Sequence, residues 1–140
     1  MTGADEHMTT RRAQCSCGQL TLVAIGDPSR ISVCHCLACQ RRTGSAFGSQ
    51  ARFARDQVQI EGQSSQYRRA GDSGQVVTFH FCPNCATTLY WELEHVPEAI
   101  AVALGAFADP TFPSPKVSVY ESRKHAWVDL RIDADLQREP

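Results

Sequence analysis

The sequence Cys34-His35-Cys36-Leu37-Ala38-Cys39 places three cysteines within six residues. Two shorter groups flank it along the chain, Cys15-Ser16-Cys17 and Cys82-Pro83-Asn84-Cys85, and the three groups together contain all seven cysteines. Cysteines that serve as small core residues would be scattered, whereas C-x-C and C-x-x-C pairs are typical of metal ligands. We therefore expect the fold to be organised around bound metal.

The seven cysteines divide into a set of four and a set of three. A structural zinc ion is closed by four protein ligands, while a catalytic zinc ion has three and keeps one position open. The favoured grouping places Cys15, Cys17, Cys82 and Cys85 in a structural site and Cys34, Cys36 and Cys39 in a catalytic site. The alternative is a zinc ribbon of Cys36, Cys39, Cys82 and Cys85, which leaves Cys15, Cys17 and Cys34.

Length and composition indicate one domain in a reducing compartment. The chain has 140 residues with 42% hydrophobic and 21% charged residues, close to globular averages. The polar N-terminus has no signal-peptide pattern, and the longest apolar stretch, Ala99–Ala108, is about half of a membrane helix. An odd number of cysteines excludes complete disulfide pairing within the chain. We therefore expect a soluble, cytoplasmic protein with no membrane contact.

The net charge argues against nucleic acid as a partner. The formal charge is −1 at pH 7, and seven ionised thiols with two Zn²⁺ ions would lower it by three more. A chain of that charge lacks the basic field that binds phosphate backbones.

Short apolar and alternating segments predict a mainly β domain with little helix. Residues 75–81 alternate with the period of two expected of a strand, and Gly44 ends one or two helical turns within residues 31–44. The other predicted strands are residues 20–25, 47–53, 58–60, 66–69, 87–93, 99–107 and 116–121.

The three cysteine motifs occur in an order that resembles the glutathione-dependent formaldehyde-activating enzyme family, which shares its domain with centromere protein V. The motifs are Cys15-Ser16-Cys17-Gly18, Cys34 to Ser45 (CHCLACQRRTGS) and Phe81-Cys82-Pro83-Asn84-Cys85. The resemblance covers residues 12–128, which leaves tails at 1–11 and 129–140. It implies a β-tent-type fold, two zinc ions per chain with the four-plus-three division, and catalysis at the three-cysteine zinc.

The activity that this resemblance implies is that of a carbon–sulfur lyase. Its substrate would be an adduct of glutathione, or a similar thiol, with an aldehyde such as formaldehyde, namely S-hydroxymethylglutathione. Two other classes stay open from the residues alone: a non-catalytic zinc-ribbon binding module, and a thiol redox or metal-handling protein.

Five individual residues carry further expectations. Arg41 and Arg42 follow the central cysteines and are expected to bind substrate carboxylates. His35 lies between two ligands and is expected to point away from the metal, while Trp127 is expected in the core. The family often has glycine after the last zinc cysteine, so Ala86 is expected in a turn with a positive φ.

Overall fold

The computed structural model describes residues 8–71, 73–132 and 135–140, and it confirms the mainly β fold. A three-stranded sheet has the order β1-β2-β5, and an eight-stranded sheet has the order β11-β10-β3-β4-β9-β8-β7-β6. The strands of the small sheet are β1 (Thr10–Gln14), β2 (Thr21–Ile25) and β5 (Val58–Glu61). Those of the large sheet are β3 (Arg30–Cys34), β4 (Gly48–Ala54), β6 (Ser65–Ala70), β7 (Val76–Phe81), β8 (Thr88–Leu93), β9 (Val96–Ala103), β10 (Val117–Val119) and β11 (Gln137–Arg138).

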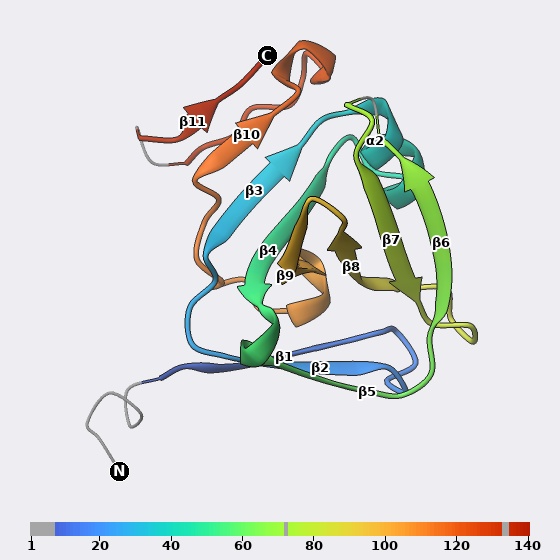
Figure 1. Ribbon diagram of the computed structural model, residues 1–140. Helices are drawn as coiled ribbons and strands as arrows, with labels where there is room; N and C mark the ends of the chain where they lie inside the picture. The colour runs from blue at the N-terminus through green and yellow to red at the C-terminus, as the bar shows by residue number, and fades with distance from the viewer. Residues whose placement is uncertain (1–7, 72, 133–134) are drawn as a thin grey trace.

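The large sheet is antiparallel from β3 through β6, whereas β10 pairs with β3, and β11 with β10, in parallel. In Figure 1 the three-stranded sheet lies below the larger one and its strands run across the view. The described α-helix, α2 (Leu37–Thr43), follows β3 directly, and three short 3-10 helices lie at η1 (Arg55–Gln57), η2 (Leu104–Phe107) and η3 (Glu121–Arg123).

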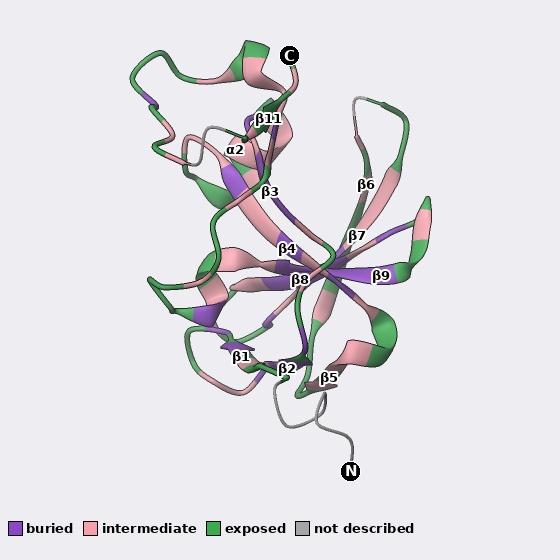
Figure 2. Cartoon of the chain, turned by 90° about the vertical axis from the view of Figure 1, so that its left-hand side faces the viewer, coloured by how far each residue is buried: buried purple, intermediate pink, exposed green. Residues whose placement is uncertain are grey.

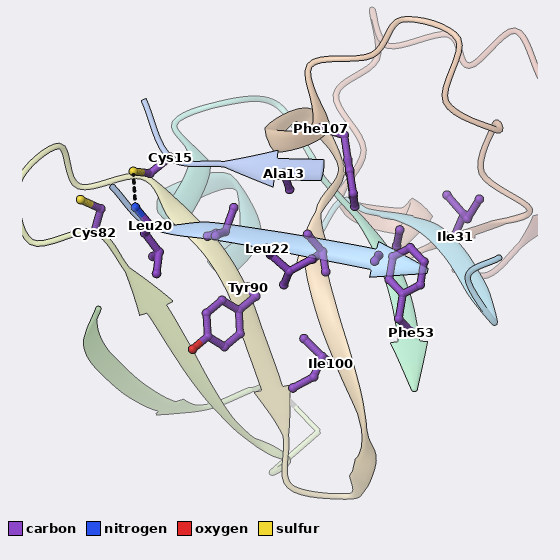
Figure 3. Packing of buried hydrophobic residues seen from close by; sticks show 14 residues of the cluster. Ala13, Cys15, Leu20, Leu22, Ile31, Phe53, Cys82, Tyr90, Ile100 and Phe107 are labelled. Atoms are coloured by element: carbon purple, nitrogen blue, oxygen red, sulfur yellow. Dashed lines mark hydrogen bonds between the residues drawn. The ribbon is translucent and has the colours of Figure 1, made fainter. Parts of the chain in front are cut away.

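The main core lies between the two sheets. Leu22 and Ala24 of β2 pack with Phe53 of β4 and Ile100 of β9, and all four side chains are buried. Figure 3 shows this cluster, and Figure 2 shows that buried residues concentrate in the central strands of the large sheet. Because side chains alternate along a strand, the other half of the side chains of the large sheet point to its opposite face, away from this core.

The opposite face of the large sheet carries a second, smaller apolar cluster. Phe79, Trp91, Leu93 and Ala101 are buried there, and the rings of Phe79 and Trp91 lie 5.6 Å apart. These residues are cross-strand neighbours, since Phe79 pairs with Trp91 and Trp91 pairs with Ala101. They form an apolar floor for the functional site described below.

Helix α2 is capped at both ends, by Cys36 at its start and by Gly44 at its end. The sulfur of Cys36, the N-cap residue, accepts a hydrogen bond of 3.3 Å from the backbone N–H of Cys39. Gly44 ends the helix with φ of 70°, and its N–H donates to the carbonyl of Gln40. The expected stop at Gly44 is confirmed.

The structure corrects several expectations about the elements. Residues 99–107 were predicted as one strand, but β9 ends at Ala103 and η2 continues to Phe107. Within the segments 1–11 and 129–140, predicted as tails, β1 begins at Thr10 and β11 lies at Gln137–Arg138, while residues 1–7 and 133–134 lie outside the described part of the chain. Trp127, predicted in the core, is 74% exposed, and its ring lies edge-on to that of His125. In the described part of the chain, no helix has the length and apolar character needed to cross a membrane.

Candidate metal centres and their pocket

The structure brings the four cysteines of the predicted structural site together. Cys15 and Cys17 follow β1, Cys82 and Cys85 follow β7, and their four sulfur atoms lie within 4.8 Å of one another. The sulfur of Cys17 is 3.7 Å from that of Cys15 and 3.6 Å from that of Cys82. A tetrahedron with Zn–S bonds of about 2.3 Å has edges of roughly 3.8 Å. The donor set and its spacing therefore fit a tetrahedral zinc ion.

Hydrogen bonds from neighbouring groups orient these sulfurs. The Leu20 N–H donates to the sulfur of Cys15 at 3.3 Å, as Figure 3 shows, and the Gln19 Nε2 donates to that of Cys82 at 3.0 Å. Hydrogen bonds from Thr87 and from the backbone lower the pKa of Cys85 to about 5. Such bonds favour the thiolate, which is the form that binds metal.

The three central cysteines form a second cluster. Cys34 ends β3, Cys36 caps α2 and Cys39 lies in its first turn, and their sulfurs also lie within 4.8 Å of one another. Hydrogen bonds from Cys34 and Cys39 lower the pKa of Cys36 to about 2, and bonds within the cluster raise the pKa of Cys34. The cluster thus holds one thiolate readily and needs a cation to hold three. The favoured four-plus-three grouping, and not the zinc-ribbon alternative, is the one that the structure assembles.

The three-cysteine cluster opens onto a cavity of about 390 Å³ over the face of the large sheet that carries the apolar floor. Cys34 and Gly48 are register partners at one end of this face, and both line the cavity. The Trp91 Nε1 donates to Gln50 Oε1 at 2.9 Å, and Gln50 Nε2 donates to the Ser32 hydroxyl at 3.1 Å. These bonds fix the indole as part of the cavity floor.

The structure separates the two arginines that the sequence predicted to bind substrate. Arg42 lines the cavity, where its guanidinium lies 4.5 Å from the Trp91 ring centroid and 5.1 Å from that of Phe79. The pKa of Cys39 is raised overall: the hydrogen bond with Cys34 and the positive charge of Arg42 lower it, but the hydrogen bond with Cys36 and burial outweigh them. Arg41 is exposed and is not among the residues that line the cavity. Substrate binding by either arginine stays a prediction.

His35 is fully buried and faces the C-terminal segment. Its Nε2 lies 3.0 Å from the Ser118 hydroxyl and 3.6 Å from Glu121, and burial lowers its pKa. Its partners therefore lie on β10 and η3, in keeping with the expectation that it points away from the metal.

Sequence reasoning missed two arginines at the far end of the cavity, Arg30 and Arg52. The signal was the alternation Arg30-x-Ser32-x-Cys34, which places all three side chains on one face of a strand. Because residues 31–44 were predicted only to contain one or two helical turns, no strand was expected there.

The fold and sites define a mainly β domain with two cysteine clusters that could hold metal ions, one closed by four sulfurs and one opening into a cavity. The sequence matches the glutathione-dependent formaldehyde-activating enzyme family over residues 10–123, and the chain belongs to that family. The solved structures include a similar fold in a protein of Rhodobacter sphaeroides, with 16% identity and a TM-score of 0.54. That match covers 73% of this chain and 90% of the other. Comparison with curated proteins found no match.

Proposed function

We propose that this protein is a zinc-dependent carbon–sulfur lyase that acts on an adduct of glutathione, or a similar thiol, with an aldehyde. The observation that carries the proposal is the three-cysteine cluster in the wall of a cavity, in a chain that belongs to the glutathione-dependent formaldehyde-activating enzyme family. The proposal also places the protein in the cytoplasm, where thiols stay reduced.

The donor sets support one Zn²⁺ in each cluster, because thiolates at this spacing suit that ion. Cys15, Cys17, Cys82 and Cys85 would hold the structural ion, and Cys34, Cys36 and Cys39 the catalytic one. Zn²⁺ with three protein ligands would supply a fourth position for the thiolate of a substrate.

The chain's own residues position the adduct and balance its charge. In the proposed direction, the C–S bond of S-hydroxymethylglutathione breaks, the hydroxyl proton leaves, and formaldehyde and a thiolate form. Arg42 is held between the Cys39 thiol and the Trp91 ring, so its charge lies where sulfur gains electrons. Phe79 and Trp91 exclude water from the floor, and the fixed Gln50 amide holds the indole in place.

The metal site is tested with Co²⁺ in place of Zn²⁺, because thiolate-to-cobalt bands report coordination. Glutathione is expected to change the spectrum of one cobalt ion per chain and leave the other unchanged, and Cys39→Ser should remove that response. A spectrum that no small thiol alters would refute the open site and leave the zinc-binding module as the better interpretation.

The reaction is tested by the rate at which S-hydroxymethylglutathione equilibrates, relative to the spontaneous background. We expect a protein-dependent rate that Cys39→Ser abolishes and that Arg42→Gln lowers by at least tenfold. A cobalt response without any rate increase would refute the lyase assignment. Reversible loss of thiols, with disulfide formation among the central cysteines, would instead favour the redox protein.

A further inference from the structure

The end of the cavity farthest from the cysteines carries two arginines in direct opposition. Arg30 on β3 and Arg52 on β4 are register partners, and both side chains line the cavity. Like charges placed opposite each other on neighbouring strands destabilise a sheet. An opposed pair of positive charges on a cavity wall therefore indicates an anionic ligand, which would offset the repulsion.

Neither guanidinium has a counter-charge in contact. Among the residues that the structure describes, no ion pair within 4.0 Å and no side-chain hydrogen bond involves Arg30 or Arg52, and both Nε atoms are buried without a partner. Burial and the charge of Arg30 lower the pKa of Arg52, and Glu98 offsets this in part without forming a pair. Glu139 carries the one side-chain carboxylate of the described cavity lining, and this carboxylate accepts a hydrogen bond from Gln137.

The other two arginines of the cavity are different, because the cysteines balance their charge. Arg42 acts on Cys39, and Arg69 lowers the pKa of Cys36. Arg69 also lies over the Phe79 ring at 5.1 Å from its centroid. Arg42 and Arg69 therefore belong to the three-cysteine end, whereas Arg30 and Arg52 have no anionic group in contact among the described residues.

We propose that Arg30 and Arg52 bind a carboxylate of the substrate at the end opposite its sulfur. The inference rests on the proposed function, and it specifies the substrate class as an elongated thiol with a remote carboxylate. Arg30 and Cys34 are four residues apart on one strand, so their Cα atoms are about 13 Å apart. A ligand that reaches both ends must be longer than a two-carbon thiol. Paired guanidinium groups suit a carboxylate, which accepts two hydrogen bonds from each fork.

The test uses S-methylglutathione, which carries both carboxylates of glutathione but has no free thiol. Isothermal titration of the zinc-loaded protein should show binding that weakens at least tenfold in the Arg30→Gln/Arg52→Gln double variant. The diethyl ester has no carboxylate and carries only the ammonium charge, so it should bind the wild type more weakly than the acid does and the double variant at least as well as the wild type. Arg68→Gln is the matched control, because Arg68 is exposed and pairs with Glu94.

Stability supplies a second measurement that separates binding from a structural role. Removing one of two opposed like charges should leave the melting temperature of the free protein unchanged or raise it. Arg52→Lys, which keeps the charge, should retain part of the affinity.

Equal binding of acid and ester by the wild type, no binding of S-methylglutathione, or a lower melting temperature in both single variants would each overturn the proposal. The cobalt response to glutathione tests the open metal site separately. A failure of the arginine site is therefore distinguishable from a failure of the proposed function.

Discussion

Ala86 has a φ of 67° in the turn that holds Cys82 and Cys85, and its N–H donates to the carbonyl of Cys82 at 2.8 Å. A Cβ in the left-handed region costs about 1–2 kcal/mol, of which the greater freedom of unfolded glycine offsets a part. We predict that Ala86→Gly raises the free energy of unfolding by roughly 0.5–1 kcal/mol. Denaturant unfolding measures this free energy. The control is Ala70→Gly, which lies in an extended strand and should lower the free energy of unfolding instead.

Gly48 lies against the three-cysteine cluster. A Cβ built there would lie 3.1 Å from the Arg42 guanidinium, 3.5 Å from the Cys39 Cβ and 3.7 Å from its sulfur. Ala should therefore displace only the flexible end of Arg42, whereas the branches of Val would reach the sulfur.

We predict two zinc ions per chain for Gly48→Ala and one for Gly48→Val, as measured by elemental analysis of the purified protein. Gly105→Val is the control, because nothing lies within 4 Å of a Cβ at Gly105. Two zinc ions in Gly48→Val would mean that a larger side chain at this position does not prevent metal binding by the three cysteines.

At the residue scale, the sequence predicted the two cysteine clusters that the structure assembles, because cysteines are scarce and their spacing is specific. The positive φ of Ala86 was also predictable, but from the resemblance, because the family often has glycine after the last zinc cysteine. The cavity was not, because Arg30 and Arg52 lie 22 residues apart and meet only through the register of β3 and β4. Trp127 was predicted wrongly for a related reason: an aromatic residue indicates burial only where other elements are there to cover it.

At the scale of elements, β7, β8 and η1 meet at the carboxylate of Glu92. His80 Nε2 lies 2.7 Å from Glu92 Oε1, and Arg55 forms an ion pair with Glu92 Oε2. The Arg55 hydrogen bond, with a smaller contribution from His80, holds the pKa of Glu92 below its ordinary value of 4.5. No local sequence pattern indicates this junction, because each partner lies on a different element.

The lowered pKa of Glu92 makes stability depend on pH. A group with a depressed folded pKa contributes stability above its unfolded pKa, and that contribution is lost as the pH falls through the folded value. We predict that Glu92→Gln lowers the melting temperature at pH 6 and that its difference from the wild type shrinks below pH 4.5. Both proteins carry the same thiols, so the effect of thiol protonation cancels when their melting temperatures are compared at each pH.

Glu94→Gln serves as the control for Glu92, because Glu94 is exposed and its ion pair is with Arg68, which is also exposed. Surface pairs of this kind contribute little to stability. If both variants change the melting temperature alike at every pH, the Glu92 junction does not set the pH dependence.

The sequence anticipated most strands, namely those with an apolar alternation such as β7. It missed β1, β3 and β11 because polar residues dominate β1 and β11, and because the cysteine motif obscured the strand in β3. Parallel pairing of β10 with β3 brings together segments more than 80 residues apart, and no local pattern encodes that contact.

For the whole molecule, the two cysteine clusters have different consequences for folding. Cys17 and Cys82 are 65 residues apart in sequence, and their sulfurs lie 3.6 Å apart, so metal there would tie the small sheet to the large one. Cys34, Cys36 and Cys39 come from one short segment that its own helix already organises. Metal binding at a site that the unfolded chain lacks contributes directly to folding free energy.

We therefore predict that Cys82→Ser unfolds or becomes insoluble, whereas Cys39→Ser stays folded with one zinc ion. Cys39 is the suitable position in its cluster because the sulfur of Cys36 also caps α2, which Cys36→Ser would disturb. Circular dichroism and elemental analysis measure fold and metal together. Cys15→Ser should behave as Cys82→Ser does, because the Leu20 N–H and the other sulfurs orient Cys15 in the core. If Cys15→Ser or Cys82→Ser melts like the wild type, the four-cysteine site does not hold the two sheets together.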